Sequence, residues 1–318
     1  MIWEILLLAF GLALLGLGAQ WLVDSAAQIA VHLGVRTFVV GLTIVAFGTS
    51  APEFMLSVMS SLSGENAFVL SNVIGSNIAN ITYVLGIYAI MAPLAIALTI
   101  EKREAWFMAA AVILLTLLAL DGTISASDGV LMLVAFLFYL VLLVRALIVC
   151  APDSNICTEF DEAIPVTRRP WKNVAIIIAG LVALTVGVEA TVTGASSIAR
   201  QFGVSDFLIG LTVIAIGTCL PEVATAATAA RRKESDIVMG NALGSLIFNS
   251  LVVVGAGVLF QPIAVTEIQI WTGLLPLVLL SPIVLLISRS KKGLGRKEGV
   301  ALLLIYAVFI GVAIAFNQ

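Results

Sequence analysis

The sequence predicts an all-α polytopic membrane protein with ten transmembrane helices in two inverted five-helix repeats. Three observations support this fold class: the apolar composition, a series of long hydrophobic stretches, and a segment that recurs in the second half of the chain. Of the 318 residues, 61% are hydrophobic and 11% are charged, whereas soluble domains average about 45–50% and about 25%. A soluble fold could not bury this excess, so we infer that lipid surrounds the chain.

The hydrophobic stretches define the expected spans, because a helix that crosses a bilayer needs about 20 mostly apolar residues. The one long polar stretch, residues 151–172, is expected to link a first repeat, residues 1–150, to a second repeat, residues 173–318. The ten predicted spans are 3–30, 37–62, 66–93, 103–120, 128–149, 173–199, 206–230, 236–260, 267–288 and 299–316.

Positive charges orient these spans. Fifteen of the 16 Lys and Arg residues follow the odd-numbered spans or lie in the linker, and Arg200 is the exception. Because cytoplasmic loops carry the excess of basic residues, we expect a multi-pass protein of the cell membrane with a cytoplasmic linker and both termini outside.

The composition also excludes several function classes. A net charge of −3 leaves no basic face for nucleic acid, and three cysteines with one histidine are too few for a zinc cluster or a disulfide scaffold. The linker has no room for a nucleotide-binding domain, which excludes an ion-motive ATPase. The N-terminus lacks the features of a signal peptide, so the first stretch is expected to be retained as a span. We therefore expect no enzymatic activity, no cofactor, and no nucleotide or nucleic-acid partner.

The repeat is the most informative feature of the sequence. Residues 41–86 align without a gap to residues 210–255, at an offset of 169, and 17 of the 46 positions are identical. Because each half holds an odd number of spans, the second half enters the membrane from the opposite side. Inverted repeats of this kind are typical of secondary transporters, whose substrate site lies near the midplane between the halves.

Two carboxylates lie at equivalent places inside the repeat. Glu53 and Glu222 fall well within their spans, with no Lys or Arg nearby in sequence. An ionised side chain at the bilayer centre costs at least about 2.5–3.5 kcal/mol on insertion scales. Two such carboxylates without a basic partner are expected only where a bound cation neutralises their charges.

The neighbouring residues fit a hard cation. Pro52 and Pro221 each lack an N–H, which is expected to free the Gly48 and Gly217 carbonyls. Calcium takes 6–8 oxygen ligands, two carboxylates balance its charge, and Na⁺ accepts the same oxygens. The residues that share these helix faces form two series, Ala46, Thr49, Ser50 and Ser57 in the first half and Ala215, Thr218 and Cys219 in the second.

A second polar stripe lies in the later part of each of the two matching segments. Asn72, Ser76 and Asn80 are spaced four residues apart, as are Asn241, Ser245 and Asn249. Such side chains either join helices by hydrogen bonds or face the glutamates, and Gly75 and Gly244 beside them are expected to allow close helix approach.

These motifs resemble the cation/Ca²⁺ exchanger superfamily, and within it the sodium/calcium exchangers and their bacterial relatives. The resemblance rests on Gly-Thr-Ser-Ala-Pro-Glu at 48–53 with Gly-Ser-Asn at 75–77 and on their second-half counterparts. It implies an antiporter in which the first and sixth helices slide past the other eight. By motif position it implies a central ion site of Thr49, Glu53, Thr218 and Glu222. The resemblance adds, for the central and flanking sites, Ala46, Ser50, Ser76, Asn80, Ala215, Ser245 and Asn249.

The sequence departs from the family pattern at three positions. Cys219 replaces an expected Ser, Leu246 stands opposite Asn77, and Asn249 occupies a position where potassium-dependent members carry Asp, which argues against K⁺ transport. The leading interpretation is exchange of Na⁺ for Ca²⁺ across the bilayer. A Ca²⁺/H⁺ antiporter that uses the same glutamates stays open, and a cation channel is disfavoured by the midplane site.

Overall fold

The computed structural model describes residues 2–64, 66–92, 100–149, 170–203, 215–289 and 294–316. Within these ranges the chain is almost entirely helical. Most of the predicted linker and the first half of the predicted span 206–230 lie outside the described residues. The boundaries of the two five-helix repeats therefore remain predictions.

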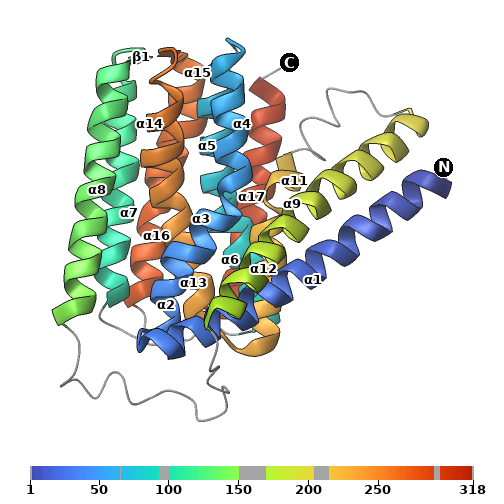
Figure 1. Ribbon diagram of the computed structural model, residues 1–318. Coiled ribbons are helices and arrows are strands. Elements are labelled where there is room, and N and C mark those ends of the chain that lie inside the picture. Colours follow the sequence, from blue (N-terminus) through green and yellow to red (C-terminus); the bar gives the residue numbers. More distant parts are fainter. Residues whose placement is uncertain are drawn as a thin grey trace.

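Two long helices form a tilted pair at one side of the molecule. Helices α1 (Ile2–Leu33) and α9 (Pro170–Gln201) run side by side and diagonally to the upright helices of the bundle (Figure 1). Helix α1 ends where Gly34 adopts a φ of 66°, a left-handed conformation that glycine adopts at no steric cost.

Glycines bring the backbones of α1 and α9 into contact. A Cβ atom on Gly18 would lie 2.7 Å from the carbonyl oxygen of Gly180, and one on Gly187 would lie 3.0 Å from that of Gly11. Because the glycines recur at seven-residue intervals, this close approach repeats along α1 from Glu4 to Leu22. The pair is also tied to the bundle, since Arg232 of α12 donates to Asp24 of α1 at 2.8 Å.

Two helices of the bundle are broken at equivalent places. Ser50 separates α3 from α4, and Cys219 separates α11 from α12; both residues have φ near −85° and ψ near 0°. Proline occupies the first turn after each break, where its missing N–H costs nothing. The segments are α2 (Thr37–Val40), a π-helical turn η1 (Gly41–Val45), α3 (Ala46–Thr49), α4 (Ala51–Leu62), α11 (Ala215–Thr218) and α12 (Leu220–Arg232).

One expectation about the first break is wrong. The Gly48 carbonyl was expected to be free, but it accepts a backbone N–H of the turn at Ser50. The backbone is tighter at this turn than in an α-helix. The Gly48 carbonyl therefore accepts a backbone N–H that precedes Pro52 in the chain, and it does not need the N–H that proline lacks.

The two helices that carry the second polar stripe share another irregularity. Each changes from α-helix to a π-helical turn at an asparagine, Asn80 in the first half and Asn249 in the second. The positions differ by 169 residues, the same offset as the sequence repeat. The segments are α5 (Asn66–Ala79), η2 (Asn80–Val84), α6 (Leu85–Met91), α13 (Ser235–Phe248), η5 (Asn249–Val253) and α14 (Val254–Gly257).

The remaining helices stand around this centre (Figure 1). The turns after α7 and α14 pair through two short antiparallel strands, with Thr123 opposite Ala264. A capping box between Thr266 and Gln269 begins the helix that follows. The elements are α7 (Ile100–Ala119), β1 (Thr123–Ile124), α8 (Ala126–Val149), β2 (Ile263–Ala264), α15 (Glu267–Gln269), η6 (Ile270–Leu274), α16 (Leu275–Arg289) and α17 (Arg296–Phe316).

Helix α13 crosses η1 at backbone contact. A Cβ atom on Gly240 would lie 2.2 Å from the Phe38 carbonyl oxygen, and one on Gly244 would lie 2.2 Å from that of Leu42. The close approach expected at Gly244 is confirmed. The segment equivalent to Leu42 in the second half lies in residues 204–214, outside the described part, so the expectation for Gly75 remains a prediction.

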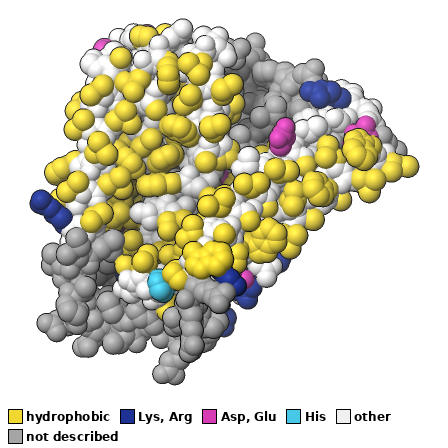
Figure 2. All heavy atoms as spheres, in the orientation of Figure 1, with side chains coloured by type: hydrophobic (Ala, Val, Ile, Leu, Met, Phe, Trp, Pro, Cys, Tyr) yellow, Lys and Arg dark blue, Asp and Glu magenta, His cyan; other side chains and the backbone are white. Residues whose placement is uncertain are grey.

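Six of the described helices are long and apolar enough to cross a bilayer. A seventh span results if the bent pair Thr37–Thr49 and Ala51–Leu62, with 41° between its segments, counts as one. Hydrophobic side chains cover most of the face shown in Figure 2, and the few charged side chains visible there lie mainly towards the ends of the helices. The chain is thus a multi-pass helical membrane protein, and the full count of ten spans remains a prediction.

Candidate functional site

The two predicted carboxylates lie at equivalent positions in the fold. Glu53 is the third residue of α4 and Glu222 the third residue of α12, each one turn beyond a helix break. Each residue has only 1% of its surface exposed. The first turn of a helix carries a partial positive charge that stabilises a carboxylate. The breaks therefore place two helix N-termini, each with a carboxylate, inside the bundle.

The carboxylates lie close to each other and to the polar stripe. Ser76 of α5 donates to Oε1 of Glu53 at 3.5 Å. The Thr49 side chain lies against Glu222, and the two glutamates are close enough to interact electrostatically. Residues from both halves of the chain thus meet at one place.

Most carboxylate oxygens at this place lack a hydrogen-bond partner in the described part of the chain. Oε2 of Glu53 and both oxygens of Glu222 are buried and unpaired. The same is true of side-chain atoms on the helices that carry the glutamates and the polar stripe, at the break before α4 and along α4, α5, η2, α12, α13 and η5. These atoms belong to Ser50, Ser57, Asn77, Asn80, Thr225, Ser245 and Asn249.

Buried polar groups are normally paired, so a concentration of unpaired oxygens points to a missing ligand. The arrangement supplies two negative charges and several neutral oxygens. None of the described ion pairs involves either glutamate, so no protein cation neutralises them there. The described residues contain no cluster of three or more His, Cys, Asp or Glu side chains. Carboxylate, hydroxyl and amide oxygens are hard donors, so the arrangement suits a hard cation more than a transition metal.

The other predicted site residues lie at or before the two helix breaks, or on the polar stripe. Ser50, Thr49 and Ser76 lie with the glutamates, and Thr49 also donates to the Asn241 amide oxygen at 3.1 Å. The Ala46 carbonyl accepts the Ser50 N–H at 3.0 Å. Thr218 and Ala215 belong to α11, which leads into the second break, and the side chain of Ala215 is not described.

Sequence reasoning missed one polar residue and one bond near the site. Thr225 is fully buried on α12, three residues after Glu222 and on the same helix face, and its hydroxyl is unpaired. The helical spacing could have identified it. The Asn77 amide donates to the Ser250 hydroxyl at 3.0 Å. The sequence could not predict that contact, because the two residues lie on different helices of different halves.

The bond between Thr49 and Asn241 makes a testable prediction. Hydrogen bonds between membrane helices contribute about 0.6 kcal/mol on average, with a maximum of about 1.7 kcal/mol. We expect Asn241→Leu to raise the KM for the transported cation about threefold. Thr49→Val should have a larger effect, because its hydroxyl also faces Glu222. A double-mutant cycle of the two variants checks this, and strict additivity of their effects would contradict the described bond.

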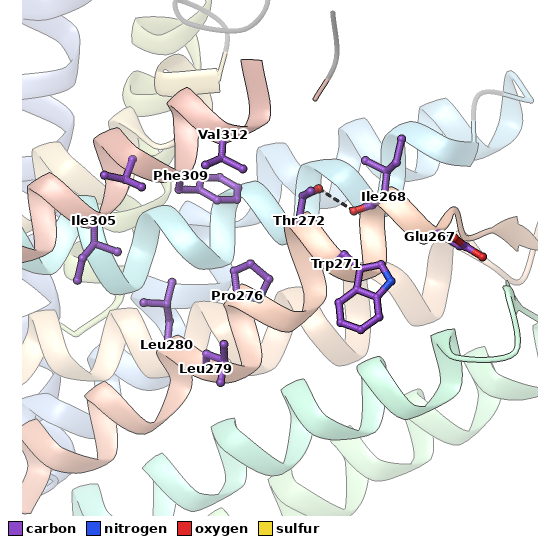
Figure 3. Close-up of a pocket in the computed structure, with 11 residues that line it drawn as sticks. Glu267, Ile268, Trp271, Thr272, Pro276, Leu279, Leu280, Ile305, Phe309 and Val312 are labelled. Carbon is purple, nitrogen blue, oxygen red and sulfur yellow. Dashed lines mark hydrogen bonds between the residues drawn. The ribbon is translucent and has the colours of Figure 1, made fainter. Parts of the chain in front are cut away.

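A surface groove lies elsewhere, between α15, η6, α16 and α17. It has a volume of about 690 Å³ and is mainly apolar. Figure 3 shows Trp271, Pro276 and Leu279 on one side and Phe309 of α17 on the other, with Thr272 bonded to the Ile268 carbonyl. It contains none of the residues predicted to bind ions, so the candidate site is the buried cluster around the glutamates.

Known proteins resemble this chain over nearly its whole length. The family model described as "Sodium/calcium exchanger protein" matches residues 3–145 and 172–315. The putative antiporter CaxA of Alkalimonas amylolytica is 38% identical over 79% of each chain. The sodium/calcium exchanger MaX1 of Methanosarcina acetivorans is 28% identical over 96% of this chain and 97% of its own.

A solved structure agrees with these matches. The fold is similar to that of the sodium-calcium exchanger NCX_Mj soaked with 2.5 mM Na⁺ and 0.1 mM Ca²⁺, with a TM-score of 0.83 and 31% sequence identity over 98% of both chains. The expected resemblance is confirmed. The chain belongs to the sodium/calcium exchanger protein family, whose members are antiporters of the membrane and not enzymes.

Proposed function

We propose that this protein exchanges Na⁺ for Ca²⁺ by alternating access around a midplane site built on Glu53 and Glu222. The observation that carries the proposal is the set of buried, unpaired oxygens on these carboxylates and on the helices that carry them and the polar stripe. One Ca²⁺ balances both charges, so the occupied site is neutral within the bilayer. Sodium ions compete for the same oxygens, because both cations prefer hard ligands.

The proposal assigns direct ion contacts to residues at equivalent positions of the two halves. The ligands are Thr49, Ser50, Glu53, Ser76, Asn80 and the Ala46 carbonyl in the first half, and Thr218, Glu222, Ser245, Asn249 and the Ala215 carbonyl in the second. Burial of the glutamates and the bond from Ser76 to Glu53 support this assignment. The amide at Asn249, in place of a carboxylate, supports exchange without K⁺.

The proposal also includes the topology that the sequence predicts. Ten spans in two inverted repeats would place both termini outside the cell membrane and the linker in the cytoplasm. The equivalent breaks at Ser50 and Cys219 support the repeat, as do the equivalent π-helical turns. The tilted pair α1 and α9 would be the part that moves, because it packs as a unit beside the helices that carry the glutamates.

Ion fluxes in proteoliposomes test the coupling. Vesicles loaded with Na⁺ are diluted into Na⁺-free buffer that contains Ca²⁺, at fixed pH and with a protonophore. We expect Ca²⁺ uptake that requires internal Na⁺. Uptake that ignores Na⁺ but follows an imposed pH gradient would replace the proposal with Ca²⁺/H⁺ exchange at the same glutamates. Flux that persists without any counter-ion gradient would indicate a channel.

A further inference from the structure

The two halves of the proposed site do not supply the same donor atoms. In the alignment with an offset of 169 residues, three buried oxygen-bearing side chains of the first half correspond to apolar or sulfur-bearing side chains in the second. The three pairs are Ser50 and Cys219, Ser57 and Ala226, and Asn77 and Leu246. The reverse case is Thr225, which corresponds to Leu56, so the halves differ at the helix break itself through the sulfur of Cys219 in place of the hydroxyl of Ser50.

The sulfur lies at the site and not behind it. Cys219 is a buried free thiol at the helix break, where it is the N-cap residue of α12, three residues before Glu222. Its Sγ lies 3.9 Å from the Thr218 hydroxyl. It also lies near Ser76 and both glutamates.

A second observation points to a ligand at this thiol. Both oxygens of Glu222 are buried and have no hydrogen-bond partner in the part of the chain that the structure describes. Glu53, by contrast, has one oxygen paired with Ser76. Glu222, the carboxylate three residues after Cys219, thus has both oxygens available to a ligand.

We propose that Cys219 and Glu222 form a soft subsite that takes thiophilic divalent cations, with Cd²⁺ as the probe. Thiolate sulfur selects soft ions, whereas carboxylates and carbonyls suit hard ones. The thiolate is the form that ligates a metal, so Cd²⁺ displaces the thiol proton to solvent when it binds, and thiolate and carboxylate together then balance the divalent charge. The inference rests on the proposed function, since it gives one half of the same site a second class of ligand. It follows that Cd²⁺ competes with Ca²⁺ through a ligand that the first half lacks.

Ultraviolet titration of the purified protein tests the inference without requiring transport. The background carries Cys150→Ser and Cys157→Ser, so that Cys219 is the remaining cysteine. We expect Cd²⁺ to produce a thiolate-to-metal charge-transfer band that Cys219→Ser abolishes. Ser50→Cys is the matched variant at the equivalent position, and with Cys219→Ser it should restore the band through Glu53.

Inhibition of Ca²⁺ flux gives a second readout. Loss of an outer-shell partner alone weakens metal binding about 10–100-fold, so loss of a direct ligand should raise the inhibitory Cd²⁺ concentration at least about tenfold. A protein that exchanges Na⁺ for Ca²⁺ but shows no charge-transfer band would overturn this inference and leave the proposed function intact. A band without any Na⁺-dependent Ca²⁺ flux would support the subsite and reject the proposed function. A band that survives Cys219→Ser would also contradict the subsite.

Discussion

Glu53→Gln and Glu222→Gln are each expected to abolish Ca²⁺ flux while the protein still folds. Each change leaves one carboxylate to balance a divalent cation, so the occupied site keeps a positive charge in a buried environment. The uncompensated charge costs about 2.5–3.5 kcal/mol, which corresponds to about a 100-fold loss of affinity. Na⁺-driven ⁴⁵Ca²⁺ uptake into proteoliposomes measures the effect.

The same variants separate a binding role from a structural one. Glutamine has nearly the size of glutamate, and both carboxylates already lack most hydrogen-bond partners, so unfolding without ions should occur at the same temperature or higher. The rise in melting temperature on adding Ca²⁺, which reports binding to the native state, should disappear. Glu267→Gln makes the same substitution at an exposed glutamate and should change neither quantity. Normal flux in either site variant would reject the assignment of the site.

Gly244→Ala is expected to have the second largest effect, although alanine is the better helix former. The new Cβ would lie 2.2 Å from the Leu42 carbonyl oxygen and 2.6 Å from the Ala46 Cβ. Neither atom belongs to a flexible side chain, so α13 must move away from η1 and α3. Overpacking of this kind costs about 1–3 kcal/mol. The shift would also break the bond from Thr49 to Asn241 and displace Ser245.

We therefore expect Gly244→Ala to lower both the melting temperature in detergent and the rate of Ca²⁺ uptake. Gly16→Ala is the matched control, because Gly16 is an exposed residue of α1 with no neighbouring atom within 4 Å of an added Cβ in the described part of the protein. Alanine is about 1 kcal/mol more favourable than glycine in a helix, so this control should be as stable as the wild type or more so. Equal behaviour of the two variants would show that the crossing tolerates a methyl group.

The sequence predicted a helical, multi-pass membrane protein because the length of its hydrophobic stretches reports directly on a membrane environment, whereas the ten spans and the inverted repeats remain predictions. It also placed Glu53 and Glu222 inside the bundle, since an isolated carboxylate in an apolar stretch has few structural uses. Pro52 and Pro221 drew attention to the places where the helices break, but the expectation there was of freed carbonyls and not of the breaks at Ser50 and Cys219. The π-helical turns at Asn80 and Asn249 could not be predicted, because both asparagines fit the spacing of an ordinary α-helix and no residue there forbids it.

Other features depend on contacts between distant segments. Nothing in the local sequence shows that Thr49 meets Asn241 or that Asn77 meets Ser250. Gly244 suggested a close approach but not its partner, which is the Leu42 carbonyl. Such pairings arise when helices from the two halves cross, and only the crossing decides which polar atoms find partners and which stay unpaired around the glutamates.

The glycine contacts between α1 and α9 have a consequence for the fidelity of exchange. One helix comes from each half of the duplicated chain, and their backbones touch at Gly18 and Gly180 with no side chain between them to absorb a displacement. A tilt of one helix must therefore carry the other with it. Under the proposed mechanism, the entrance on one side of the membrane cannot open unless the entrance on the other side closes. The pair would thus prevent a leak in which both entrances are open and the sodium gradient dissipates without moving calcium.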